Sequence, residues 1–147
     1  MLADLTPEQR ARLARGWVWQ VGHLPARCKA RITIVEPKGD ICVDDPERDI
    51  WFAKDELVPD LTDPVTADGL LRTARAVLKI PSLAAVVYSE NDGKPDLWAL
   101  QRFCFYFGPD HELLTSEGWG GPSTKTMLWK SEPAALLAAI LAAPEAQ

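Results

Sequence analysis

The residue types that most often do chemistry are sparse in this chain. Its 147 residues include two histidines and three cysteines, and no C-x-x-C or H-x-x-x-H pair occurs among them. Structural zinc sites usually begin with such closely spaced ligands, and here His23 and Cys28 are the nearest two. We therefore predict no metal site, and we expect the widely spaced Cys28, Cys42 and Cys104 to be reduced thiols.

The glycine-rich segment 118–126 is the closest approach to a nucleotide-binding motif. A phosphate-binding loop has Gly-Lys-Ser/Thr opening directly into a helix, so that backbone N–H groups point at the phosphates. Here Thr124 stands before Lys125 in place of glycine, and Pro122 removes a backbone donor. We predict no cofactor, and we interpret the segment as a turn or as a partner-contacting loop around Trp119.

The sequence identifies no catalytic residue. Nucleophilic catalysis needs a serine or cysteine beside a histidine and a carboxylate, and no Gly-x-Ser-x-Gly elbow is present. Paired carboxylates occur in segment 44–49, which lacks the alternating ligands and the central glycine of a calcium loop. We therefore interpret that segment as a solvated acidic loop.

Charge is distributed unevenly along the chain. Residues 10–31 carry six basic and no acidic side chains, whereas residues 40–68 carry ten acidic and two basic ones, within a net charge of -5. One interpretation is internal: the first helix, or a stripe of Arg72, Arg75 and Lys79, lies across the acidic segment. The other interpretations are self-association through opposite charges, giving a homodimer, and an acidic face that binds a basic partner.

The candidate binding residues combine these acids with tryptophans, of which the chain has six. Trp17 and Trp19 would point to the same side of a strand; facing outward beside Arg15 and Arg27, they would form an aromatic and cationic contact surface. The alternative is that they belong to the core. The predicted binding residues are Asp44, Asp45, Glu47, Asp49, Asp55, Glu56, Asp60, Trp17, Trp19 and Trp119.

Composition indicates a globular protein. Hydrophobic residues make up 47% and charged residues 25% of the chain, and the longest apolar run, 134–143, is too short to cross a bilayer. We expect a cytoplasmic protein with no membrane association, because the N-terminus has no secretory pattern. An isoelectric point near 5.0 argues against direct binding to nucleic acid and leaves a protein as the expected partner.

Local patterns predict the elements of the first half. Thr6, Pro7 and Gln9 have the types and spacing of a capping box, which begins a helix over 7–15. Segment 17–21 has strand residues, and segments 31–35 and 41–43 flank a turn typical of a hairpin. Residues 49–53 add a further short strand.

The second half follows a similar order. Asp63 and Pro64 begin an amphipathic helix that ends before Pro81, with Gly69 as a tolerated weak point. Strands are expected over 84–89, 97–107, 112–115 and 125–129, and a last helix opens at 132. The prediction is an α+β fold: one domain over 1–147, with an antiparallel sheet of two meander or hairpin segments packed with about three helices.

One segment resembles a known group of proteins. Residues 58–66, Val-Pro-Asp-Leu-Thr-Asp-Pro-Val-Thr, precede an amphipathic helix, and Gly-Trp-Val-Trp stands upstream at 16–19. This arrangement resembles small uncharacterised proteins encoded by phages and prophages. The resemblance implies no catalytic residue; it implies an accessory protein that binds host machinery.

We therefore expect a non-catalytic protein-binding accessory protein, phage- or mobile-element-encoded, that inhibits a host or defence protein through an acidic, partly aromatic surface. Two alternatives remain open. One is a small hydrolase or ligand-binding α+β domain whose site is assembled from scattered polar residues. The other is a self-assembling structural component.

Overall fold

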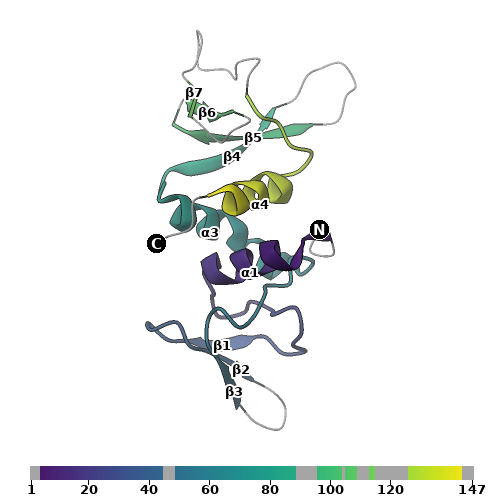
Figure 1. Ribbon diagram of the computed structural model, residues 1–147, viewed down its shortest axis with the longest axis vertical. Coiled ribbons are helices and arrows are strands. Elements are labelled where there is room, and N and C mark those ends of the chain that lie inside the picture. The colour runs from purple at the N-terminus through teal and green to yellow at the C-terminus, as the bar shows by residue number, and fades with distance from the viewer. Residues whose placement is uncertain are drawn as a thin grey trace. The chain divides into compact units, whose positions relative to one another are not determined.

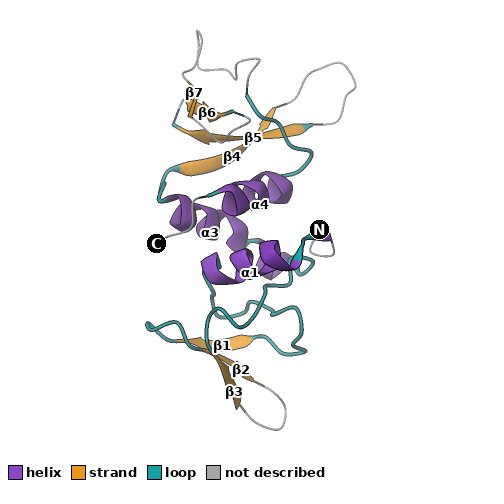
Figure 2. Cartoon of the chain, in the orientation of Figure 1, coloured by secondary structure: helices purple, strands orange, loops and turns teal. Residues whose placement is uncertain are grey.

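The computed structural model describes residues 4–44, 49–88, 96–103, 105–108, 113–114 and 126–143. Helices and two antiparallel sheets make up the fold, which confirms the predicted α+β class (Figure 2). The chain divides into two compact units, Met1–Thr73 (unit 1) and Ala74–Gln147 (unit 2), which are described separately below. That the whole chain is one domain stays a prediction.

The first helix of unit 1, α1 (Pro7–Gly16), begins at the predicted capping box. The Thr6 hydroxyl accepts a hydrogen bond from the Gln9 backbone N–H (3.1 Å), and the Gln9 side chain accepts one from the Thr6 N–H (3.0 Å). These reciprocal bonds satisfy donors that a helix end otherwise leaves unpaired. Leu13 and Ala14 form the buried face of α1.

Unit 1 also contains a three-stranded antiparallel sheet (Figure 1). Its strands, in the order in which they lie, are β1 (Ile32–Val35), β2 (Ile41–Asp44) and β3 (Asp49–Phe52). The central strand β2 is the most buried, with Ile41, Cys42 and Val43 at most 3% exposed. The predicted hairpin and the third strand are therefore confirmed.

A β-bulge in β1 changes which side chains face outward. Ile32 lies opposite Val43, and Ile34 lies opposite Cys42, so one extra residue, Thr33, is inserted into β1. Because a bulge shifts the alternation by one residue, Ile32 and Ile34 point to opposite faces of the sheet. Ile32 is 1% exposed and Ile34 is 46% exposed.

The predicted second helix forms in two pieces, α2 (Pro64–Ala67) and α3 (Gly69–Leu78), which are separated at Asp68. Gly69 is more than a weak point in this helix. A Cβ at this position would lie 2.8 Å from His23 Cε1 and 2.9 Å from Trp17 Cζ2. Glycine is required because two aromatic rings pack directly on the backbone.

Unit 2 contains a four-stranded antiparallel meander and the helix α4 (Glu132–Ala142), which contacts two of its strands. Ser131 caps α4 by accepting a hydrogen bond from the Ala134 N–H (3.2 Å). The strands lie in the order β4 (Leu83–Tyr88), β5 (Leu97–Arg102), β6 (Phe105–Phe107) and β7 (Leu113–Leu114). The second predicted meander is therefore confirmed.

The prediction of one long strand over 97–107 is wrong. The chain turns at Phe103, which has a φ of 54° and is 70% exposed, and Arg102 then pairs with Phe105. An apolar run without Gly or Asn gives no pattern typical of such a turn. In the described residues, the predicted strand over 125–129 is reduced to a bridge between Trp98 and Trp129.

We predict that Gly69→Ala lowers the free energy of unfolding by about 1–3 kcal/mol, because the added methyl group overlaps two buried rings. Urea denaturation measures this change. Gly16→Ala, in the last turn of α1, is the matched control and should be neutral or stabilising, because alanine favours helix. Equal stability of Gly69→Ala and the unmodified chain would contradict the packing described here.

Candidate functional site

Trp17, Trp19 and His23 form an aromatic cluster in the core of unit 1. They are 3%, 6% and 2% exposed, and their ring centroids lie 5.7–6.2 Å apart. The expectation that Trp17 and Trp19 face a partner is wrong, and the core alternative holds. The predicted strand over 17–21 is absent, so spacing by two does not place these rings on one exposed face. Trp19 Nε1 instead donates to the carbonyl of Lys54 (3.0 Å).

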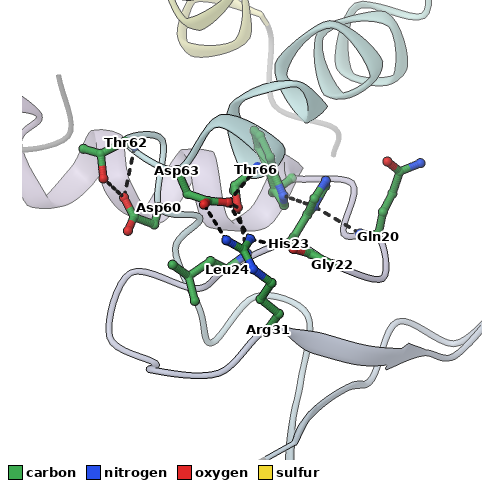
Figure 3. Close-up of polar contacts among 10 residues, drawn as sticks. Gln20, Gly22, His23, Leu24, Arg31, Asp60, Thr62, Asp63 and Thr66 are labelled. Atoms are coloured by element: carbon green, nitrogen blue, oxygen red, sulfur yellow. Dashed lines mark hydrogen bonds and ion pairs between the residues drawn. The ribbon is translucent and has the colours of Figure 1, made fainter.

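The His23 imidazole is held as a neutral hydrogen-bond acceptor. Its Nδ1 accepts from Trp17 Nε1 (3.3 Å) and from the Gln20 backbone N–H (3.1 Å), as Figure 3 shows for Gln20. Two donors at Nδ1 require this nitrogen to be unprotonated. Burial lowers the pKa of His23; the Asp63 carboxylate acts to raise it, and the Arg72 guanidinium to lower it.

A chain of polar contacts joins the start of β1 to the start of α2 (Figure 3). Arg31 donates to both carboxylate oxygens of Asp63 (2.7 Å each) and to the Gly22 carbonyl (3.0 Å). The Thr66 hydroxyl donates to Asp63 (2.8 Å) and accepts from the Leu24 N–H (2.7 Å). The bonds from Arg31 and Thr66 hold the pKa of Asp63 well below its usual range.

These groups hold the chain in place and offer little to a substrate. His23 Nδ1 already accepts two N–H groups, and the Asp63 carboxylate accepts from Arg31 and Thr66. A general base needs a lone pair directed at the proton that it removes. In the part of the chain that the structure describes, no three His, Cys, Asp or Glu side chains are grouped as metal ligands.

The Arg31–Asp63 pair compensates part of the charge asymmetry inside unit 1, because it joins the basic segment to the acidic one. Two further predicted binding residues are engaged in turns. The Glu56 carboxylate accepts from the Ala53 N–H (3.3 Å), and Asp60 Oδ1 accepts from the Thr62 N–H (3.0 Å). Their carboxylates therefore have local structural roles.

The remaining acids are less constrained. Asp44 and Asp49 are directly opposite each other at the end of the β2–β3 ladder, and both are exposed, as is Asp55. No ion pair joins them to another residue that the structure describes. Asp45, Glu47 and Trp119, which were also predicted to bind, lie outside the described residues.

Two exposed apolar side chains lie beside these acids on the sheet of unit 1. Cys42 is directly opposite both Ile34 and Trp51, and directly opposite residues project to the same face. Ile34 is 46% and Trp51 49% exposed, with buried Cys42 between them. The strand alternation places Asp44 and Asp49 on this face too. We call it the outer face: Ile34, Cys42, Asp44, Asp49 and Trp51.

The sequence prediction missed Trp51 as a surface residue. The alternation in Asp-Ile-Trp-Phe over 49–52 was the available indication, because it places Asp49 and Trp51 on one side and Ile50 and Phe52 on the other. Ile34 could not have been assigned from alternation, because only the bulge turns it outward.

Two cysteines are described, Cys28 and Cys42, and both are free thiols. Burial raises the pKa of the Cys28 thiol, which favours its protonated form. Cys104 lies outside the described residues.

Among the described residues, no helix is long and apolar enough to cross a membrane. Comparison of the chain with protein-family models, with curated proteins and with solved structures finds no match.

We predict that Asp63→Asn lowers the thermal unfolding midpoint at neutral pH, because it removes the charge that binds Arg31. Since the pKa of Asp63 is lower in the folded state than its usual 3.8, this carboxylate stabilises the fold above that pH and loses its effect as pH falls below it. The difference between variant and unmodified chain should therefore shrink in acid. Asp68→Asn, at an exposed position, is the control; a difference that persists unchanged in acid would contradict the assignment.

We also predict that the unmodified chain loses stability as pH falls below 6.5, the usual pKa of histidine, because the unfolded state binds a proton that buried His23 resists. In His23→Asn the amide oxygen can still accept the two N–H groups, but it does not titrate. This variant should be less stable at pH 7 and change less on acidification towards pH 5. His111→Asn, which removes the chain's other histidine, should keep the slope; its loss there would refute the assignment.

Proposed function

We propose that this chain is a non-catalytic protein-binding module and that the outer face of the unit 1 sheet is its contact surface. The observation that carries the proposal is the exposure of Trp51 and Ile34 directly beside the paired acids Asp44 and Asp49. Tryptophan is among the residue types enriched at the centres of protein interfaces. A half-exposed tryptophan on a short sheet face has apolar area available for a partner.

The paired acids define the chemistry of that partner. Like charges directly opposite each other on a sheet are destabilising. A lysine or arginine from a partner would remove the repulsion between Asp44 and Asp49 and orient the contact. The expected partner surface therefore places a basic side chain next to an apolar patch that accepts Trp51.

The inhibitory role is part of the same proposal. A net charge of -5 and an exposed acid pair favour binding to basic protein surfaces and disfavour contact with phosphate backbones. A module that covers a basic surface blocks whatever that surface normally binds. We therefore propose inhibition of a host or defence protein. That the gene is carried by a phage or another mobile element is proposed from the resemblance of residues 58–66 alone.

We predict that Trp51→Ala weakens partner binding by about 30-fold, as expected for a residue worth about 2 kcal/mol at an interface centre. The double variant Asp44→Lys/Asp49→Lys should weaken binding further as it repels the basic group. The partner is first identified by capture from cells that carry the gene and is then purified. Isothermal titration calorimetry gives the Kd for each variant.

Two matched controls distinguish loss of this contact surface from the effects of a changed net charge or of truncating an exposed apolar side chain elsewhere. Glu36→Lys/Asp40→Lys makes the same change in charge at the opposite end of the β1–β2 hairpin and should leave the Kd unchanged. Val65→Ala truncates another half-exposed apolar residue of unit 1 and should also be neutral. A purified partner whose Kd is the same for Trp51→Ala and the unmodified chain would refute the proposed surface.

A further inference from the structure

The strand β4 is one of the two outer strands of the unit 2 sheet, and one side of its backbone faces away from β5 (Figure 1). The Leu83 N–H donates to the Ile80 carbonyl (3.2 Å), and the Leu83 carbonyl accepts from Arg75 Nε (2.9 Å). Both backbone groups of Leu83 therefore point away from β5. Backbone groups alternate along a strand, so those of Ala85 and Val87 point the same way.

The hydrogen bonds of the neighbouring strand β5 support this assignment of the outward groups of β4. Trp98, which is directly opposite Val87, exchanges both of its backbone hydrogen bonds with Trp129 (2.7 and 2.8 Å). Trp98 and Val87 are therefore a non-hydrogen-bonded pair of the β4–β5 ladder. No residue that the structure describes bonds to the outward N–H and C=O groups of Ala85 and Val87.

The residues of β4 do nothing to protect this edge. Proteins usually protect an edge strand with a charge, a proline, a bulge or a very short length. The β4 sequence, Leu-Ala-Ala-Val-Val-Tyr, has neither charge nor proline. In contrast, β1 has a bulge and bonds through Ile32 to Gly22 and His23, β3 begins with Asp49, and β7 has only two residues.

We propose that β4 pairs antiparallel with β4 of a second copy of this chain, about a two-fold axis at Val86. In this register Ala85 lies opposite Val87 of the second copy, and each such pair exchanges both backbone hydrogen bonds. All the outward groups of Ala85 and Val87 are then satisfied. An axis at Ala85 would place Val87 opposite Leu83, whose backbone groups are already occupied.

A second copy fits this edge because the strand is uncharged, so two identical strands meet without repulsion. In the part of the chain that the structure describes, the other edge of the sheet, β7, has only two residues, too few to continue the pairing, so we expect the assembly to close at a dimer. The net charge of -5 on each copy opposes association, and salt screens that repulsion. This dimer should therefore hold or strengthen at high salt, whereas a dimer formed through opposite charges would weaken.

Sedimentation equilibrium of the full chain tests the association. We expect the mass to rise from 16.3 kDa to twice that value with concentration, at low and at high salt. Amide hydrogen exchange tests the surface: the N–H groups of Ala85 and Val87 should exchange slowly in the dimer and fast in dilute solution. The N–H groups of Ala84 and Val86, which face β5, should be protected in both.

Val87→Pro removes an outward N–H without removing a bond of the β4–β5 ladder, so it should abolish the dimer and leave the fold intact. Val87→Lys introduces an edge charge and should also give a monomer, which covers the case in which proline disturbs the strand. Val87→Thr keeps the N–H and the strand preference and should still dimerise. Circular dichroism checks the fold of each variant.

Three results would overturn the proposal. The first is a monomer at every concentration and salt. The second is a dimer in which the Ala85 and Val87 amides exchange as fast as in the monomer, because another surface then mediates association. The third is a folded Val87→Lys variant that dimerises like the unmodified chain.

Discussion

The Asp63 carboxylate is the constraint on which the structure of unit 1 depends. It caps α2 through Thr66, binds both outer nitrogens of Arg31 immediately before β1, and accepts from the hydroxyl that holds Leu24. One side chain thereby ties together the helix start, the sheet start and the loop between α1 and β1. Because Arg31 directly precedes β1, this ion pair fixes the point at which the chain enters the sheet that carries Trp51.

A second constraint explains why Trp17 and Trp19 are buried, whereas Trp51 is exposed. Trp17 and His23 pack on the backbone at Gly69, and His23 Nδ1 accepts from the Trp17 ring. This arrangement requires the segment after α1 to leave regular structure, so both Trp17 and Trp19 point into the core. A strand at 17–21 would have placed them side by side. Tertiary packing therefore outweighs the local strand propensity of residues 17–21.

The features that the sequence could predict are those with local causes. Thr6 and Gln9, Asp63 and Pro64, and the hairpin over 31–43 each carry their own signature within a few residues. The bulge at Thr33 and the turn at Phe103 do not, because each depends on the strand beside it. For the candidate site, Asp44 and Asp49 were identified by their charge. Trp51 was missed because its exposure depends on which face of the sheet is covered.

The two sheets differ in the kind of surface that they leave available to a partner. In unit 1 both edges are limited, by the bulge of β1 and by Asp49 in β3, so what remains is a face of side chains with apolar area and negative charge. Such a face selects a partner by the chemistry of its side chains. In unit 2 the backbone groups without a hydrogen-bond partner among the described residues are the outward N–H and C=O of Ala85 and Val87 in β4, which carry no charge and little sequence information. Such an edge suits the same strand of a second copy better than a strand of another protein. Register and two-fold symmetry then supply the specificity that the side chains of β4 lack.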